Sequence, residues 1–478
     1  MMNRSAFFAA CCIAATAVCL PLSACDSAES RARAAYTDYQ AASAAGDLQA
    51  ARIALLKLVA AQDDVASNWQ ELGKVQVQLG AYQDAYYAYT RAHELDRTDV
   101  ETVATLAQLA LLSGNMDLAE QHAKNLELLR SDHPVIKLAY GYVALKRMDL
   151  DEADKNADSL LAAYPSEPGA TLLKSRIFAA RGEFEQAIGI LENQAKARPD
   201  DAGALKSLTM LYQRKGDWRG VESAAKRLWS LNPKASENGL TVVDAALRAG
   251  DFEAARQASE DLMQPDAPTA QVEAVLDLWS EHWTGPDAIA EARRLAEEAS
   301  PGQKLAYAGY FNDVGAAKDA LALTGDKPVM PLQRWNLSRN ALIAGALAQA
   351  GRASEAKELF DGILVREPDH VYALRGRINL EIRTGQAKAA IVDAQRLVSI
   401  EPKSARDRLL LARAYAAAGN VRQVDRTLWN AFHEIPANLQ LYEVLRARVL
   451  ETDGPDSARS LDDEFAQQRD VTIAREFI

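Results

Sequence analysis

Thiols and imidazoles are the side chains of this sequence best suited to covalent or metal chemistry, and their positions limit what they can do. All four cysteines lie in the first 25 residues: Cys11, Cys12, Cys19 and Cys25. If that stretch is a processed signal, the remaining chain has no free thiol for a disulfide, a nucleophile or a zinc site. The six histidines are scattered without metal-ligand spacing: His93, His122, His133, His282, His370 and His433. No Walker loop, GxGxxG, GxSxG or HExxH occurs. The sequence therefore predicts a protein that is not an enzyme and holds no metal or cofactor.

Cys25 is the one residue with a specific predicted chemistry. A short basic start and an apolar run, Ala6 to Leu20, precede the sequence Leu22-Ser23-Ala24-Cys25. This pattern resembles the bacterial lipobox. The resemblance implies that residues 1–24 are a signal peptide and that the Cys25 thiol accepts diacylglycerol. The small Ser23 and Ala24 would let the chain fit a protease that cuts before Cys25. The alternative is an ordinary secretory signal with a chance cysteine.

A lipidated Cys25 would anchor the protein in the bacterial cell envelope, facing the periplasm. Two or three acyl chains hold a protein firmly, whereas one chain is marginal. Residues 25–30 would form a short tether before helical pattern begins. Asp26 resembles the inner-membrane retention signal of enterobacterial lipoproteins, or it simply begins the linker, so the choice between inner and outer membrane stays open.

Beyond the tether, the chain repeats with a period of 34 residues. Glycines recur at that interval, with one double gap whose midpoint is Met148. An alanine follows most of these positions by five residues, and a proline follows several by 17. The glycines of this frame are Gly46, Gly80, Gly114, Gly182, Gly216, Gly250, Gly351, Gly385 and Gly419.

Each repeated residue has a physical role in a pair of helices. Glycine ends the first helix, where a positive φ is needed. Alanine lets the second helix cross the first closely, and proline stops the second helix. Apolar spacings of three and four, as in Leu106, Leu109 and Leu112, predict amphipathic helices.

A 34-residue helix-turn-helix period resembles the tetratricopeptide repeat. The best match has Trp69, Leu72, Gly73, Gly80, Ala85 and Ala92 in the family's places. The resemblance implies an all-α fold, an α-solenoid (superhelix) of about thirteen helical pairs. We expect an N-terminal array at 31–265, degenerate helical repeats at 266–335, a C-terminal array at 336–454, and a capping helix and tail at 455–478.

The frame breaks between Gly250 and Gly351. Gly285 and Gly315 are the candidate helix-ending glycines there, at irregular spacing. The stretch also holds Trp279, Trp283 and Trp335. It is interpreted either as degenerate repeats whose aromatic residues fill the core, or as a hinge or specialised pocket.

A ligand groove is predicted in the C-terminal repeats. In this fold the first helix of each pair lines the concave groove, and Tyr372, Arg375, Asn379 and Arg383 are spaced to share one face of such a helix. Arg406 and Arg413 follow on the next first helix, and Arg448 on the one after. Arg followed by Asn one turn later resembles part of the carboxylate clamp that holds a peptide C-terminus. The alternative is that these arginines pair with acids on neighbouring helices.

The net charge and the local excess of basic residues limit the classes of partner that we expect. The formal net charge of −12 argues against general nucleic-acid binding. Residues 366–449 nevertheless carry 14 Lys and Arg against nine Asp and Glu. We expect other envelope proteins or peptides as partners, the membrane through the lipid anchor, and no small-molecule substrate.

The resemblance implies three kinds of function. The first is an envelope scaffold in a secretion, pilus-assembly or polysaccharide-export apparatus. The second is a periplasmic chaperone or outer-membrane assembly factor that binds extended client peptides. The third is an enzyme or enzyme regulator in cell-wall polymer turnover.

Overall fold

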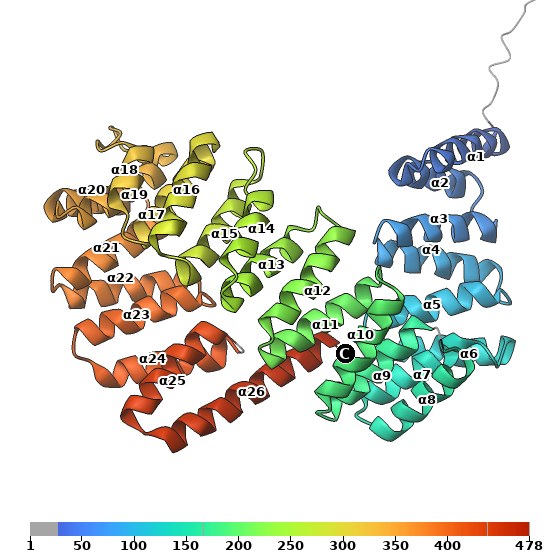
Figure 1. The fold of residues 1–478 in the computed structure, drawn as a ribbon. Helices are drawn as coiled ribbons and strands as arrows, with labels where there is room; N and C mark the ends of the chain where they lie inside the picture. The colour runs from blue at the N-terminus through green and yellow to red at the C-terminus, as the bar shows by residue number, and fades with distance from the viewer. Residues whose placement is uncertain (1–26, 166, 437, 478) are drawn as a thin grey trace, which may run out of the picture. The chain divides into compact units, whose positions relative to one another are not determined.

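Pairs of antiparallel helices build the whole of the described chain. The computed structural model describes residues 27–477 apart from Ser166 and Ala437, without the side chains of 469–477. These residues form 26 α-helices, one short 3₁₀ helix and no strand, which confirms the all-α solenoid (Figure 1). The 26 helices make thirteen pairs only if α26, which the sequence predicts as a cap after the repeats, is counted as the partner of α25. The signal peptide 1–24, Cys25 and Asp26 lie outside the described residues. No helix within the described part is long and apolar enough to cross a membrane.

The chain divides into two compact units, with the boundary between Asn156 and Ala157 inside α8. The first unit contains α1 (Ala28–Ala44), α2 (Leu48–Ala61), α3 (Ala66–Gln78), α4 (Tyr82–Leu95), α5 (Val100–Leu112), α6 (Met116–Leu129), α7 (Pro134–Lys146) and the start of α8 (Leu150–Ala163).

The second unit begins within α8 and holds the remaining helices. Its helices are α9 (Pro168–Ala180), α10 (Phe184–Ala197), α11 (Ala202–Lys215), α12 (Trp218–Leu231), α13 (Ser236–Ala249), α14 (Phe252–Leu262), α15 (Thr269–His282), α16 (Pro286–Glu298), α17 (Pro301–Asp313), α18 (Ala317–Thr324), α19 (Leu337–Gln349), α20 (Ala353–Arg366), α21 (Val371–Arg383), α22 (Ala387–Ile400), α23 (Ala405–Ala417), α24 (Val421–Glu434), α25 (Leu439–Thr452) and α26 (Pro455–Phe477), with the 3₁₀ helix η1 (Arg334–Asn336) before α19.

The repeated glycines end the first helices, as their spacing predicts. All nine have φ between +69° and +84°, the left-handed region that side chains disfavour. Met148 occupies the one position of the frame, between Gly114 and Gly182, where glycine is missing. It also adopts a positive φ, of +59°. Gly315 also has a positive φ, but Gly285 does not. With φ −74° it is the N-cap of α16, so the prediction that Gly285 ends a first helix is wrong.

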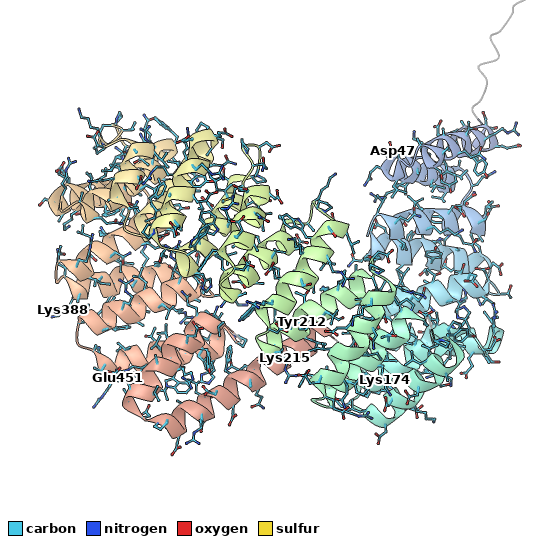
Figure 2. All side chains as sticks on the ribbon, viewed as in Figure 1. Asp47, Lys174, Tyr212, Lys215, Lys388 and Glu451 are labelled. Carbon is cyan, nitrogen blue, oxygen red and sulfur yellow. The ribbon has the colours of Figure 1, made fainter. Side chains whose placement is uncertain are left out.

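Polar side chains at the next position start many of the second helices. The Asp47 carboxylate accepts the backbone N–H of Ala50 at 2.9 Å at the beginning of α2 (Figure 2). Asn115 and Asp217 cap α6 and α12 in the same way. Each cap satisfies a backbone donor that has no partner within its helix. Glycine to end one helix and Asx to begin the next therefore make the tight turn inside these pairs, whereas α4, α10, α20 and α22 begin without a side-chain cap.

Alanine makes the crossing between the two helices close. The alanines five residues after the glycines are at most 1% exposed: Ala51, Ala85, Ala119, Ala153, Ala187, Ala255, Ala356 and Ala390. Gly73 serves the same purpose from the first helix, because a Cβ there would lie 2.6 Å from the Tyr89 ring. Side chains larger than alanine do not fit such contacts without displacing a neighbouring helix.

The stretch 266–335 continues the stack with altered connections. Trp279 on α15 is fully buried and its indole N–H donates to Ser259 Oγ at 3.0 Å. Trp279 also packs against Trp283 in the core that runs from α12 to α19. Trp335, in contrast, is 72% exposed on η1. Two of the three tryptophans therefore pack in or against the core, and α15 and α17 also contribute side chains to the groove described below.

The last helix, α26, covers the open end of α25. Leu461 and Phe465 are buried against it, with the Phe465 ring stacked on Tyr442 at 4.1 Å. α26 also contacts α9 and α11 of the same unit.

Replacing Ala187 with Trp tests the close crossing. Ala187 on α10 is fully buried, so the indole must force the helix pair apart. We expect Ala187→Trp to lower the free energy of unfolding by about 1–3 kcal/mol, measured by urea denaturation followed by far-ultraviolet circular dichroism. Gln186→Trp places the same ring on the exposed side of the same helix and should change stability by at most about 0.5 kcal/mol. Equal urea midpoints for the two variants would contradict the packing argument.

Candidate ligand groove

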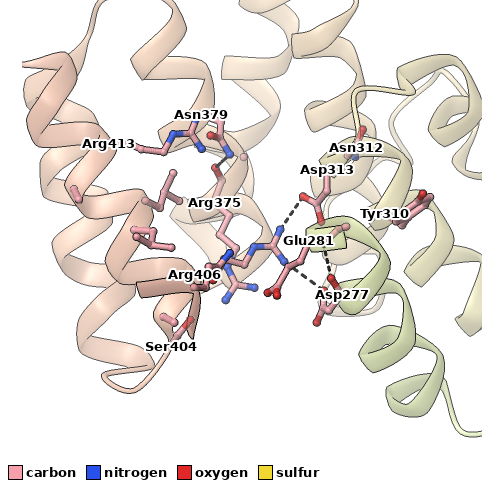
Figure 3. Close-up of a pocket in the computed structure, with 18 of the residues that line it drawn as sticks. Asp277, Glu281, Tyr310, Asn312, Asp313, Arg375, Asn379, Ser404, Arg406 and Arg413 are labelled. Carbon is pink, nitrogen blue, oxygen red and sulfur yellow. Dashed lines mark hydrogen bonds and ion pairs between the residues drawn. The ribbon is translucent and has the colours of Figure 1, made fainter. Parts of the chain in front are cut away.

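The second unit contains a groove lined by the first helices of successive pairs. Its cavity has a volume of about 1660 Å³. Its walls come mainly from α13, α15, α17, α19, α21, α23 and α25. Figure 3 labels lining residues of α15, α17, α21 and α23. Since each first helix packs on the next, side chains of one helical face come together along the groove.

All seven residues of the predicted ligand groove line this cavity. Tyr372, Arg375, Asn379 and Arg383 come from α21, Arg406 and Arg413 from α23, and Arg448 from α25. Ala341 and Gly345 of α19, small residues in the preceding first helix, line it as well. The geometry thus places them together, while ligand binding by these residues stays a prediction.

Arg375 is held by acids of its own wall. Its guanidinium donates two hydrogen bonds to the Asp407 carboxylate, at 2.7 and 2.8 Å, and a third to Glu401 at 3.2 Å. Asp407 is fully buried, so this pair resembles an internal salt bridge more than a free ligand contact. The geometry at Arg375 thus matches the alternative interpretation, in which the arginines pair with acids on neighbouring helices.

Arg448 and Asn379 are also engaged locally. Arg448 Nε donates to Asp425 at 3.0 Å, and a second nitrogen lies 3.5 Å from Glu451. The Asn379 amide donates to the Arg375 carbonyl oxygen, one turn earlier on the same helix, at 3.0 Å. These two residues therefore shape the wall and retain only part of their hydrogen-bonding capacity.

Arg383 and Arg413 differ from the other groove arginines. Both are exposed in the cavity. Neither forms an ion pair or a hydrogen bond with any residue that the structure describes. Two guanidinium groups without a protein partner, one on α21 and one on α23, give this wall free capacity for an anion.

An acidic wall faces these arginines, and sequence reasoning missed it. Glu273, Asp277 and Glu281 follow one another at intervals of four on α15, and Asp313 ends α17. Partial burial in the groove raises the pKa of Asp277, although Arg406 opposes the shift. Partial burial also raises the pKa of Glu281. The spacing of four was visible in the sequence, but the distance to the arginines was not.

The two walls touch across the groove. Arg406 donates to Asp313 at 2.7 Å and to Asp277 at 3.4 Å (Figure 3). The Tyr372 hydroxyl donates to Glu273 at 3.1 Å. These partners are 93 to 129 residues apart in the chain. Tyr372 and Arg406 are thus occupied by the opposite wall.

Two further polar atoms in the groove have no partner. Asn312 Oδ1 and Gln349 Oε1 are both buried acceptors without a hydrogen-bond donor among the described residues. Both residues line the cavity, Asn312 from α17 and Gln349 from α19. Because these two oxygens are buried, the guanidinium groups of Arg383 and Arg413 are the free polar groups that the groove presents to a ligand, and they suit an acidic group.

Metal chemistry finds no support in the described part of the chain. No group of three or more His, Cys, Asp or Glu side chains there is arranged to hold a metal ion. His122, for example, is buried beside Tyr86, whose hydroxyl lies 2.9 Å from its Nε2. Burial lowers the pKa of His122 to about 4, so it is neutral in the core.

Comparison with curated proteins finds two relatives from cellulose synthase operons. The chain is 22% identical over 398 residues to cellulose synthase operon protein C of Pseudomonas fluorescens, covering 77% of this chain and 29% of that protein. It is 22% identical over 429 residues to cellulose synthase 2 operon protein C of Komagataeibacter xylinus, covering 84% of this chain and 30% of that protein. The chain thus spans about three-tenths of the length of these curated relatives. No family model matches it.

The chain is also similar to solved structures of repeat proteins, with low TM-scores. A tetratricopeptide repeat protein from Parabacteroides merdae is 16% identical with a TM-score of 0.37, covering 52% of this chain and 98% of that one. PilW, a type IV pilus biogenesis factor, is 20% identical with a TM-score of 0.33, covering 41% of this chain and 92% of that one. At these scores the fold assignment rests on the helix pairs described above.

The different engagement of the groove arginines gives a testable contrast. Arg375→Ala would leave the buried Asp407 carboxylate without its main partner, so we expect a loss on the order of 3 kcal/mol in unfolding free energy. Arg413→Ala removes no protein contact and should change stability by at most about 0.5 kcal/mol. Thermal and urea denaturation of the two variants measure the difference. If both variants unfold like the unmodified protein, the Arg375–Asp407 pair does not stabilise the fold.

Proposed function

We propose that this protein is a cell-envelope scaffold that holds an extended, acidic peptide segment of a partner protein in the groove of its second unit. Helix-pair solenoids present such concave surfaces to peptides and partner proteins. The observation that carries the proposal is the pair of exposed, unengaged arginines, Arg383 and Arg413, which line one cavity.

Among the envelope machines considered, we favour a polysaccharide-export apparatus over secretion or pilus assembly. Both curated relatives are named for cellulose synthase operons, which supports this choice. The partner would be another protein of that apparatus. A chaperone for many extended clients is the alternative that the same groove would allow, and the number of partners distinguishes the two.

Removing the two free arginines tests the groove. We expect Arg383→Ala with Arg413→Ala to reduce the recovery of a specific partner by about tenfold, because each lost charge-assisted contact weakens binding while the fold is unaffected. Partners are recovered by mild crosslinking in cells and counted by quantitative mass spectrometry. The same interaction in the unmodified protein should weaken as salt rises.

The matched control removes two cations outside the groove. Lys388 on α22 and Arg422 on α24 are exposed and do not line the cavity. Lys388→Ala with Arg422→Ala therefore changes the net charge equally. Equal partner recovery from the groove variant and the control would refute the groove proposal. A fixed stoichiometric partner supports the scaffold, whereas many weak clients lost together would favour the chaperone.

We also propose that the protein is lipidated at Cys25 and faces the periplasm. The support is the match of Leu22-Ser23-Ala24-Cys25 to the lipobox. Asp26 as an inner-membrane retention signal stays a prediction, as does the identity of the membrane.

Metabolic labelling tests the anchor. Cells supplied with an alkyne fatty acid should label the unmodified protein, and Cys25→Ser should abolish the label because the thiol that accepts diacylglycerol is gone. Cys19→Ser, which removes a thiol upstream of the cleavage site, is the control and should label normally. Label retained in the Cys25→Ser protein would show that the anchor lies elsewhere or is absent.

A further inference from the structure

The contacts that cross the groove differ in kind from the packing that builds its walls. Backbone packing joins α15 to α17, α17 to α19, α19 to α21 and α21 to α23. The link from α15 and α17 to α21 and α23 runs instead through the ends of long polar side chains, Arg406 and Tyr372. Such contacts can break without disturbing the core of any helix pair.

These contacts are also partly open to water. The Arg406 side chain is 42% exposed, and its partners Asp277 and Asp313 are 65% and 34% exposed. Ion pairs in such surroundings are weak, because solvent screens them and holding two long side chains costs entropy. An anion that enters the groove could therefore replace the carboxylates at Arg406.

The carboxylates at Arg406 belong to the chemical class of group that an acidic ligand would bring. Asp277 and Asp313 give Arg406 the same kind of oxygen acceptor that an acidic peptide would bring. Arg383 and Arg413 on the same wall have no such internal partner. Of the five arginines of the predicted ligand groove, Arg375, Arg406 and Arg448 are thus paired with the protein's own acids, and two are free.

We propose that the acidic residues of α15 and α17 form an electrostatic latch, in which Asp277 and Asp313 occupy Arg406 as internal substitutes for an acidic peptide and hold the groove closed. Tyr372 and Glu273 make a second contact of the latch. An acidic peptide first meets Arg383 and Arg413, then displaces Asp277 and Asp313 from Arg406, and the two walls separate. This inference rests on the proposed function for the identity of the ligand, but the latch itself does not.

Peptide affinity gives the first test. The probe is a fluorescein-labelled hexaglutamate peptide, with hexaglutamine as the uncharged comparison, in fluorescence anisotropy on the full-length protein. We expect Asp277→Asn with Asp313→Asn to bind hexaglutamate about three- to tenfold more tightly than the unmodified protein, because the internal competitors are gone. Glu297→Gln with Glu298→Gln removes the same two charges from exposed positions of α16 that do not line the groove. If the unmodified protein binds hexaglutamate, a gain in affinity no larger than in this control would overturn the latch.

The distance between the walls gives the second test and needs no ligand. Ser280 on α15 and Ser404 just before α23 both line the groove. The native cysteines lie only at Cys11, Cys12, Cys19 and Cys25, so a chain with these four changed to Ser can carry two spin labels at Ser280→Cys and Ser404→Cys. Pulsed electron paramagnetic resonance should show a short, narrow distance distribution for the latched protein. Asp277→Asn with Asp313→Asn should lengthen and broaden it.

The two tests separate the latch from the proposed function. Hexaglutamate added to the unmodified labelled protein should shift the distances in the same direction as the substitutions. If the peptide binds through Arg383 and Arg413 but the distances stay constant in every sample, the latch is wrong and the groove function survives. If hexaglutamate does not bind but the substitutions lengthen the distance, the latch exists and the proposed ligand is wrong.

Discussion

The close crossing of two helices at a buried alanine or glycine is the contact on which this architecture depends. At the alanine positions the second helix lies so near the first that the residue is almost fully buried. The turn that brings the helices together contains a residue with positive φ, usually glycine, and in many pairs the next side chain caps the second helix. Because the regular pairs meet the same packing requirement, the same residues recur every 34 positions up to Gly250 and again from Gly351.

Such local packing leaves the exposed faces of the first helices free to differ. A residue such as Arg413 contributes nothing to the crossing, so its identity can be set by the groove alone. Arg375 shows the intermediate case, since it points into the groove but is tied to the buried Asp407. In this groove, then, exposure to the cavity does not identify a ligand contact, and the presence or absence of a protein partner is the more informative property.

The repeat frame made most of the fold predictable from the sequence. Spacing alone identified the helix-ending glycines, the crossing alanines and the face shared by Tyr372, Arg375 and Arg383. Gly285 was misassigned because glycine is also acceptable before a helix. The connection that follows Trp283 differs from that of the regular repeats, and Gly285 lies there at the start of α16. Met148 kept the frame although its residue type does not favour positive φ, which indicates that the packing on both sides determines the turn there.

The acidic wall could not be found in the same way, because its position depends on a sum of small rotations. Each pair turns the stack by an amount that no single residue encodes, and only after four first helices does α15 come to face α23. The Arg406 contacts with Asp277 and Asp313 therefore join residues about a hundred positions apart, with no periodic signal between them. Several helix pairs therefore lie between the residues that these contacts join. A small change in the crossing of any intervening pair alters the distance between the walls, so a ligand that competes for one arginine can act on the shape of the whole groove.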